Sequence, residues 1–309
     1  MRAVRRPIPF PVIACACAAL ACDTSSFREV DVSLAPERRA PETPAPPPAR
    51  TLRFSVAAVE SPRDTYAAYA RLFRRIGERL GVEIEFVQRR TYREVNDLLA
   101  NGQLEAALVC TGGYLDLRRR APEKVEIVAV PIVGGLPTYQ SVVIVPADSP
   151  ARTLADLAGE RFAYTDELSL SGHAYVVRRL RDEGRDPSRF FGFTVFTQNH
   201  DRSIRAVASG LVDGAAVHGH VLRHLLERDP ELRRGVRVLH RSEPIGAMPV
   251  VVSTGLDPAT RARLREVLLA IAEDPDGAAA LATLGIDRFD PPPSPRLYED
   301  AARVMEALR

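Results

Sequence analysis

The segment RFAYTDELSLSGH, residues 161–173, holds the pattern from which the fold prediction starts. Residues 161–164 are typical of a short buried strand, and apolar residues at helical spacing follow over 171–183. Ser169 or Ser171 can cap that helix, which leaves other backbone N–H groups of its first turn free to bind a ligand. Hydroxyls beside free N–H groups at the positive end of a helix are typical of an anion site. A plain N-cap is the alternative explanation of the same residues.

A second polar cluster follows another expected strand. Residues 193–196 are expected to form that strand and residues 200–209 a helix. The loop TQNHD joins them, and in it Asp201 is a natural N-cap while His200 can donate a hydrogen bond to an oxyanion. The alternative is that Asn199 and Asp201 only cap the helix and His200 is merely exposed.

The third cluster follows the apolar run at residues 106–109. There the chain continues into Cys110, Thr111 and two glycines, and glycines let backbone N–H groups approach a ligand closely. The alternative is a glycine turn beside an inert, buried cysteine. All three clusters lie where a strand ends and a helix begins, which is where open α/β sheets bind their ligands.

Strand-like and helix-like runs alternate from residue 51 to residue 309, and this order predicts an α/β fold. A single sheet rarely accommodates so many strands. We therefore expect two lobes, each a mostly parallel sheet flanked by helices, with a ligand cleft between them. The first lobe is discontinuous and comprises residues 51–145 and 245–309, and the second comprises residues 146–240.

The composition excludes two broad classes of protein. The 309 residues are 46% hydrophobic and 27% charged, with a net charge of +2. A wholly disordered chain and a strongly basic nucleic-acid binder do not fit these values. The three arginines of residues 1–21 account for more than the whole net charge, so any attraction for an anion must be local.

The N-terminal residues are predicted to direct export and anchoring. Residues 1–21 have a basic head, a short apolar stretch and small residues before Cys22, which is typical of a secretory signal peptide. The small residues before Cys22 resemble a lipobox, so we expect lipidation of Cys22; an ordinary cleaved signal is the alternative. Residues 22–50 are rich in proline and predict a tether. Past it, Cys110 is the single cysteine, which excludes an internal disulfide in the body of the protein.

These motifs, with their order and spacing, resemble a known family. From about residue 53 to residue 308 the chain is similar to the phosphate, phosphite and phosphonate substrate-binding proteins of ABC importers, the phosphonate-binding family of type II periplasmic binding proteins. The resemblance is carried by RTYREVNDLL (90–99), YQSVVIVPADSP (139–150), LADLAG (154–159), SLSG (169–172), NHD (199–201) and AVASGLVDGAA (206–216).

The resemblance implies a set of ligand-binding residues. The SLSG stretch would hold the phosphorus oxygens, although Leu170 stands where the family has a hydroxyl residue. His200 matches a family histidine, and two tyrosines match aromatic positions that close over the ligand. The expected ligand-binding residues are Tyr92, Cys110, Thr111, Tyr139, Ser169, Leu170, Ser171, Gly172, Asn199, His200 and Asp201.

The resulting functional prediction is a lipid-anchored, monomeric binding protein on the periplasmic side of the cell membrane. It would bind a small oxyanion of the phosphate, phosphite or phosphonate class and deliver it to an ABC permease in the inner membrane, with no catalysis, cofactor, metal or nucleic acid. A ligand with an amine tail is not expected, because His220 and Met248 stand where aminoalkylphosphonate binders place acids. The alternative is an arsenite-type oxyanion sensor that uses Cys110 and signals to a membrane histidine kinase.

Three further interpretations remain open from residue types alone. His218, His220 and His224 could form a metal site on a helix, although surface histidines are more common. Ser169, His200 and Asp201 could form a catalytic triad, but the last two are sequence neighbours whose side chains diverge. A binding protein for an uncharged or cationic metabolite, such as a pyrimidine vitamin precursor, is disfavoured by the low aromatic content and the lack of Trp.

Overall fold

The computed structural model describes residues 50–59, 61–292, 294 and 296–308. The expected signal peptide, Cys22 and all but the last residue of the expected tether lie outside these residues. Within the described part of the chain, no helix combines the length and the apolar character needed to cross a membrane.

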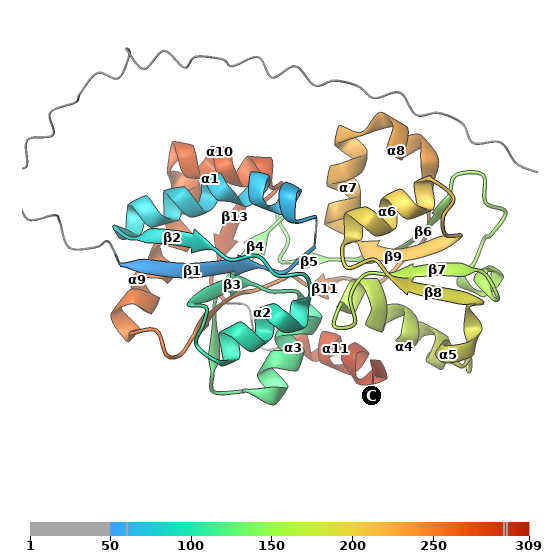
Figure 1. The fold of residues 1–309 in the computed structure, drawn as a ribbon, viewed down its shortest axis with the longest axis horizontal. Helices are drawn as coiled ribbons and strands as arrows, with labels where there is room; N and C mark the ends of the chain where they lie inside the picture. The colour runs from blue at the N-terminus through green and yellow to red at the C-terminus, as the bar shows by residue number, and fades with distance from the viewer. Residues whose placement is uncertain (1–49, 60, 293, 295, 309) are drawn as a thin grey trace, which may run out of the picture. The chain divides into compact units, whose positions relative to one another are not determined.

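The first lobe is built on a six-stranded sheet in the order β13-β4-β12-β3-β1-β2 (Figure 1). Helices α1, α9 and α10 pack on one face of this sheet and helices α2 and α3 on the other. The strands are β1 (Thr51–Val56), β2 (Glu83–Phe86), β3 (Ala106–Leu108), β4 (Val125–Ile132), β12 (Val250–Ser253) and β13 (Arg288–Asp290). The helices are α1 (Pro62–Leu80), α2 (Tyr92–Ala100), α3 (Thr111–Arg120), α9 (Pro258–Ala270), the short η3 (Ile271–Glu273) and α10 (Pro275–Thr283).

The second lobe is built on a five-stranded sheet in the order β10-β6-β9-β7-β8. Helices α6, α7 and α8 cover one face, and η2, α4 and α5 lie on the other. The strands are β6 (Ser141–Pro146), β7 (Arg161–Tyr164), β8 (Phe193–Phe196), β9 (Gly214–His218) and β10 (Val236–Arg241). The helices are η1 (Leu154–Leu157), η2 (Leu170–Ala174), α4 (Tyr175–Asp182), α5 (Pro187–Phe190), α6 (His200–Ala208), α7 (Gly219–Arg228) and α8 (Pro230–Gly235).

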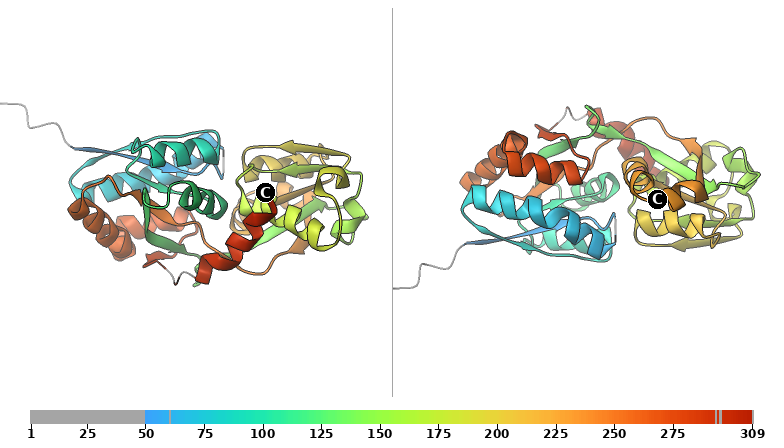
Figure 2. Two further views of the ribbon diagram at one scale, coloured as in Figure 1. Left: turned by 90° about the horizontal axis from the view of Figure 1, so that it is seen from below. Right: turned by 90° about the horizontal axis from the view of Figure 1, so that it is seen from above.

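Two short strands and one helix connect the lobes. Strands β5 (Thr138–Tyr139) and β11 (Ile245–Gly246) pair antiparallel and form a hinge ribbon between the two sheets. Helix α11 (Arg296–Met305) contacts α3 of the first lobe and both η2 and α4 of the second, and Figure 2 shows it running across the two lobes. It is followed by the short helix η4 (Glu306–Leu308).

The α/β class and the two-lobed architecture are confirmed, but the sheets are mixed rather than mostly parallel. In the second sheet β6 runs antiparallel to both of its neighbours, and in the first sheet β12 runs antiparallel to β3 and β4. Each of these is the first strand of a sheet after the chain has crossed the hinge. The reversal therefore follows from the crossovers, which bring the chain into each sheet from the end where the other strands finish.

Strand pairing also moves one expected lobe boundary. Residues 141–145 were expected in the first lobe, but β6 pairs with β9 and β10 of the second sheet. The chain therefore leaves the first lobe before Ser141. The reason is visible in the packing, because the four apolar residues of β6 at positions 142–145 are completely buried within the second lobe.

Candidate ligand-binding site

The carboxyl ends of strands from both lobes converge on one site. The loops after β1, β2 and β3 supply the first lobe's part, and those after β7, β8 and β9 supply the second lobe's part. This is the position at which open α/β sheets bind ligands. Most of the expected site residues lie here and are buried: Tyr92, Cys110, Thr111, Tyr139, Ser169, Leu170, Ser171 and His200.

The loop after β7 begins η2, a π-helical turn that leads into α4. Ser169 is its N-cap, and its hydroxyl accepts a hydrogen bond from the Gly172 N–H at 2.9 Å. Glycine is required at position 172, since a Cβ there would lie 2.4 Å from the Thr165 hydroxyl oxygen. π-Helical turns recur at functional sites. Of the two serines expected to cap this helix, Ser169 does so, which leaves the Ser171 hydroxyl for another role.

Two buried hydroxyls in the site have no hydrogen-bond partner among the described residues. They belong to Ser171, which is 0% exposed, and to Tyr139, which is 2% exposed. Burial raises the pKa of Tyr139, and the hydroxyls of Thr111 and Ser171 lie near enough to oppose that rise without meeting hydrogen-bond geometry. A buried polar group without a partner is costly, so both hydroxyls are expected to bind something else.

His200 is held as a neutral imidazole. Its Nδ1 accepts a hydrogen bond from the His218 backbone N–H at 3.1 Å and lies 2.9 Å from the Thr165 hydroxyl. Complete burial lowers the pKa of His200 to about 3, so the ring is neutral and carries a single proton. Because Nδ1 accepts a hydrogen bond, that proton is on Nε2. This nitrogen lies 3.5 Å from the Tyr92 hydroxyl oxygen. The Nε2–H can therefore donate to the tyrosine oxygen, which leaves the tyrosine O–H to donate to a ligand.

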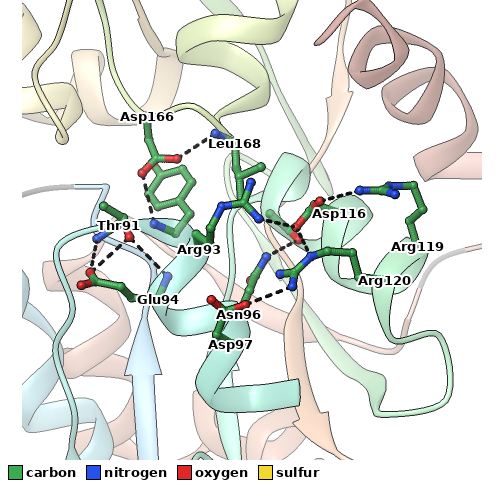
Figure 3. A network of polar contacts seen from close by, with 12 residues as sticks. Thr91, Arg93, Glu94, Asn96, Asp97, Asp116, Arg119, Arg120, Asp166 and Leu168 are labelled. Carbon is green, nitrogen blue, oxygen red and sulfur yellow. Dashed lines mark hydrogen bonds and ion pairs between the residues drawn. The ribbon is translucent and has the colours of Figure 1, made fainter. Parts of the chain in front are cut away.

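Tyr92 is positioned by the start of α2. Thr91 and Glu94 form a capping box there, and Tyr92 is the first residue of the helix. The Tyr92 backbone N–H donates to the Asp166 carboxylate at 3.1 Å, and the same carboxylate accepts from the Leu168 N–H (Figure 3). Asp166 was not among the expected site residues. It lies two residues after the strand at residues 161–164, which marks it as a strand-end residue, but nothing near it in the sequence indicates that its partner is Tyr92.

The Asp166 contact belongs to a wider polar network around α2 and α3. Asp116 of α3 accepts from Arg120 at 2.7 Å and from Arg119 at 3.2 Å, and its carboxylate lies 3.8 Å from Arg93 of α2 (Figure 3). The pairs that join α2 to α3 are Arg93 with Asp116 and Asp97 with Arg120, the latter at 3.0 Å. The position of Tyr92 is therefore set by its own helix cap and by the helix next to it.

Cys110 lies where the two lobes touch. It is the N-cap residue of α3 and makes no side-chain capping bond. Burial raises the pKa of its thiol, although the N–H groups of Leu170, Gly112 and Gly113 lie close enough to oppose the rise. The lobes approach each other so closely that a Cβ on Gly112 would lie 2.2 Å from the Leu168 carbonyl oxygen. The thiol is thus protonated and enclosed.

The residues at the start of α6 serve the contact between the lobes. Asn199, not Asp201, is the N-cap residue, so the expected capping role of Asp201 is wrong. The Asn199 side chain donates to the Ala58 carbonyl and the His200 backbone N–H donates to the Val59 carbonyl, both at 2.9 Å. Asp201 lies near the Ser61 N–H, and burial raises the pKa of its carboxyl.

The geometry does not support a triad or a metal centre. Among the described residues, the hydrogen-bond partners of the His200 ring are Thr165, Tyr92 and the His218 N–H, rather than Ser169 or Asp201. In the part of the chain that the structure describes, no group of three His, Cys, Asp or Glu side chains is arranged to hold a metal ion. What the site offers a ligand is a set of buried, uncharged donors.

Comparison with known proteins identifies relatives of this chain. Residues 54–296 match the family described as "ABC transporter, phosphonate, periplasmic substrate-binding protein". The chain is 24% identical over 225 residues to the phosphate-import protein PhnD of Mycolicibacterium smegmatis, which covers 70% of each chain. Its fold is similar to that of the binding protein component of an ABC phosphonate transporter from Pseudomonas aeruginosa, with a TM-score of 0.77, 20% identity, and coverage of 84% of this chain and 89% of that one. It is also similar to PhnD1 from Prochlorococcus marinus in complex with methylphosphonate, with a TM-score of 0.76, 17% identity, and coverage of 84% and 98%.

Proposed function

Because this chain belongs to the family of periplasmic substrate-binding proteins of phosphonate ABC transporters, we propose that it binds a small phosphorus oxyanion between its lobes and delivers it to a permease. The family consists of binding proteins rather than enzymes. The ligand class we propose is phosphate, phosphite or phosphonate without an amine tail.

The observation that supports this proposal best is the pair of buried, unpartnered hydroxyls of Ser171 and Tyr139. Ser171 belongs to the second lobe and Tyr139 to the hinge ribbon. A ligand that accepts hydrogen bonds from both would satisfy two donors that otherwise destabilise the closed arrangement. Hydrogen bonds to a charged acceptor are about twice as strong as neutral ones, so an oxyanion suits these donors better than a neutral ligand.

The remaining donors act from around this pair. They are the Tyr92 hydroxyl, which the neutral imidazole of His200 supports from 3.5 Å, and the N–H groups of the η2 turn on the second-lobe side. All of these donors are uncharged. We therefore propose that selectivity comes from fixed dipoles in a buried site, where they interact more strongly than in water.

Cys110 fits this proposal as a packing group. Its raised pKa disfavours the thiolate that would coordinate trivalent arsenic, and its environment is the lobe contact at Gly112. We accordingly favour the importer over the arsenite sensor. Lipidation of Cys22, anchoring at the periplasmic side of the membrane and a monomeric state remain parts of the proposal that rest on the sequence.

Calorimetric titration with phosphate, phosphite and methylphosphonate tests the proposal. The Ser171→Ala and Tyr139→Phe variants are each expected to weaken binding at least about tenfold, because each removes a hydrogen bond to a charged group. His200→Ala is expected to weaken it several-fold. Ser209→Ala is the control, since that serine is exposed and bonds only within its own helix. No binding of any of these anions, or unchanged affinity in all three site variants, would refute the proposed site.

A further inference from the structure

A cavity adjoins the proposed oxyanion site at Tyr139. It has a volume of about 80 Å³ and is bounded by residues of both lobes. Tyr139 links the two, because its hydroxyl is part of the unpartnered pair and the residue also lines the cavity. The Tyr139 ring stacks on that of His218, with centroids 3.9 Å apart and planes 7° apart, and His218 also lines the cavity. A molecule bound at the Tyr139 hydroxyl would therefore lie against a residue that also lines this cavity.

Most residues that line the cavity are apolar, and the polar ones are histidines, threonines and tyrosines. Helix α1 contributes Ala68 and Tyr69, α7 contributes Val221, and Met248 lies before β12. None of the described residues that line the cavity is Asp, Glu, Lys or Arg.

The imidazoles that line the cavity are neutral as well. Burial lowers the pKa of His218 well below its usual value and lowers that of His220 to about 4. The charges that act on His220 are Arg223 and Asp287, and their effects on its pKa oppose each other. His224 has a lowered pKa through burial and Arg228, with Glu227 acting against them. The cavity thus presents no charge to pair with an ammonium or a carboxylate.

We propose that this cavity binds the organic substituent of the ligand, and that the substituent is a short, uncharged alkyl group on a phosphonate held by Ser171 and Tyr139. The inference rests on the proposed function and adds the substituent class to it. The volume is about half that of a 150 Å³ apolar cavity that binds benzene, so there is room for about two or three carbon atoms.

The walls predict a specific order of affinities. Each methylene group moved from water into the cavity should strengthen binding about fourfold. An ammonium group in the same place would lose its water without gaining a carboxylate partner, which is strongly unfavourable. Alkylphosphonates up to propyl are therefore expected to bind more tightly than phosphate, and aminoalkylphosphonates more weakly than alkylphosphonates of the same size.

A matched pair of ligands tests the charge preference. Propylphosphonate and 2-aminoethylphosphonate have the same number of heavy atoms and differ in the terminal group. Calorimetric titration should show that propylphosphonate binds at least about 100-fold more tightly. Equal affinity, or tighter binding of the amine, would overturn the inference.

Two variants test the location of the substituent. Ala68→Leu fills part of the cavity and should remove the advantage of ethylphosphonate over phosphate while changing phosphate affinity less than about threefold. Ala67→Leu is the control, because that residue is exposed on the same helix and does not line the cavity. Met248→Glu should strengthen 2-aminoethylphosphonate binding at least about tenfold relative to Met248→Gln, which has the same shape without the charge.

The outcomes separate this inference from the proposed function. If neither phosphate nor any phosphonate binds, the proposed function fails and the inference fails with it. If phosphate and methylphosphonate bind and depend on Ser171, while chain length, terminal charge and the Ala68→Leu variant make no difference, the inference alone is overturned.

Discussion

Tyr139 borders two environments that differ in what they can bind. Around the hydroxyl are donors that need an acceptor, above all Ser171, whereas the cavity that Tyr139 also lines has mostly apolar walls and neutral imidazoles. Buried residues line both environments, Ser171 the first and His218 the second. The difference shows that burial alone does not determine which ligand binds. Unpartnered donors select an anionic group, whereas an uncharged lining selects the substituent that this group can carry.

The largest expected effect comes from a change that acts on both environments at once. In Gly112→Ala the new Cβ would meet the Leu168 carbonyl at 2.2 Å and hold the lobes apart. Calorimetry should show at least about a 100-fold loss of affinity for every ligand, because the closed state is depopulated. Gly113→Ala is the matched control, since its Cβ would meet nothing closer than Asn96 at 3.6 Å. Equal effects of the two variants would contradict the close approach of the lobes.

A smaller loss is expected when a single contact between the lobes is removed. Asp166→Ala deletes the acceptor of the Tyr92 backbone N–H, so the first turn of α2 loses its partner in the second lobe. Affinity for phosphate and for alkylphosphonates should fall together by about tenfold. Glu167→Ala serves as the control because its side chain is exposed. A loss confined to alkylphosphonates would mean that Asp166 acts on the cavity rather than on closure.

The neutral state of His200 predicts a dependence of stability on pH. Its native pKa is about 3, whereas an unfolded histidine titrates near 6.5. Below pH 6.5 the unfolded chain binds a proton that the native protein excludes, so stability is highest above pH 6.5 and falls as the pH decreases toward 3. For each unit by which the pH falls in this range, His200 lowers the free energy of unfolding by at most about 1.4 kcal/mol.

Urea unfolding of the wild type and of His200→Gln at about pH 7 and pH 5 measures that dependence. The wild type should lose about 1–2 kcal/mol more than the variant between these two pH values. Asp166 and Asp201, whose raised pKa values act in the opposite direction, are present in both proteins and cancel in the comparison. Equal losses would show that His200 is not held neutral in the native protein.

The smallest effect is expected at the thiol. Cys110→Ala removes a protonated, enclosed side chain that supplies no strong donor. Affinity for methylphosphonate in a calorimetric titration should change less than about threefold. A loss of tenfold or more would show that the thiol contacts the ligand and would reopen its role in selectivity.

How well the sequence predicts a feature of this molecule depends on how far apart along the chain the interacting residues lie. The SLSG motif indicated the Ser169 cap correctly, because capping is decided by neighbours within one turn. It could not indicate the roles of Asp166 or Asn199, whose partners Tyr92 and Ala58 lie in the other lobe. The lobe boundary at β6 was misplaced for the same reason, since strand pairing is decided by partners far along the chain. The cavity beside Tyr139 combines residues from five or more separate elements and has no sequence motif.

A crystal structure of the protein with methylphosphonate tests the central claim most directly. Phosphonate oxygens should lie about 2.5–3.0 Å from the hydroxyl oxygens of both Ser171 and Tyr139, and the methyl group should point toward the cavity beside the Tyr139 ring. A phosphonate bound elsewhere, or one bound between the lobes with both hydroxyls still without contact to it, would contradict the account.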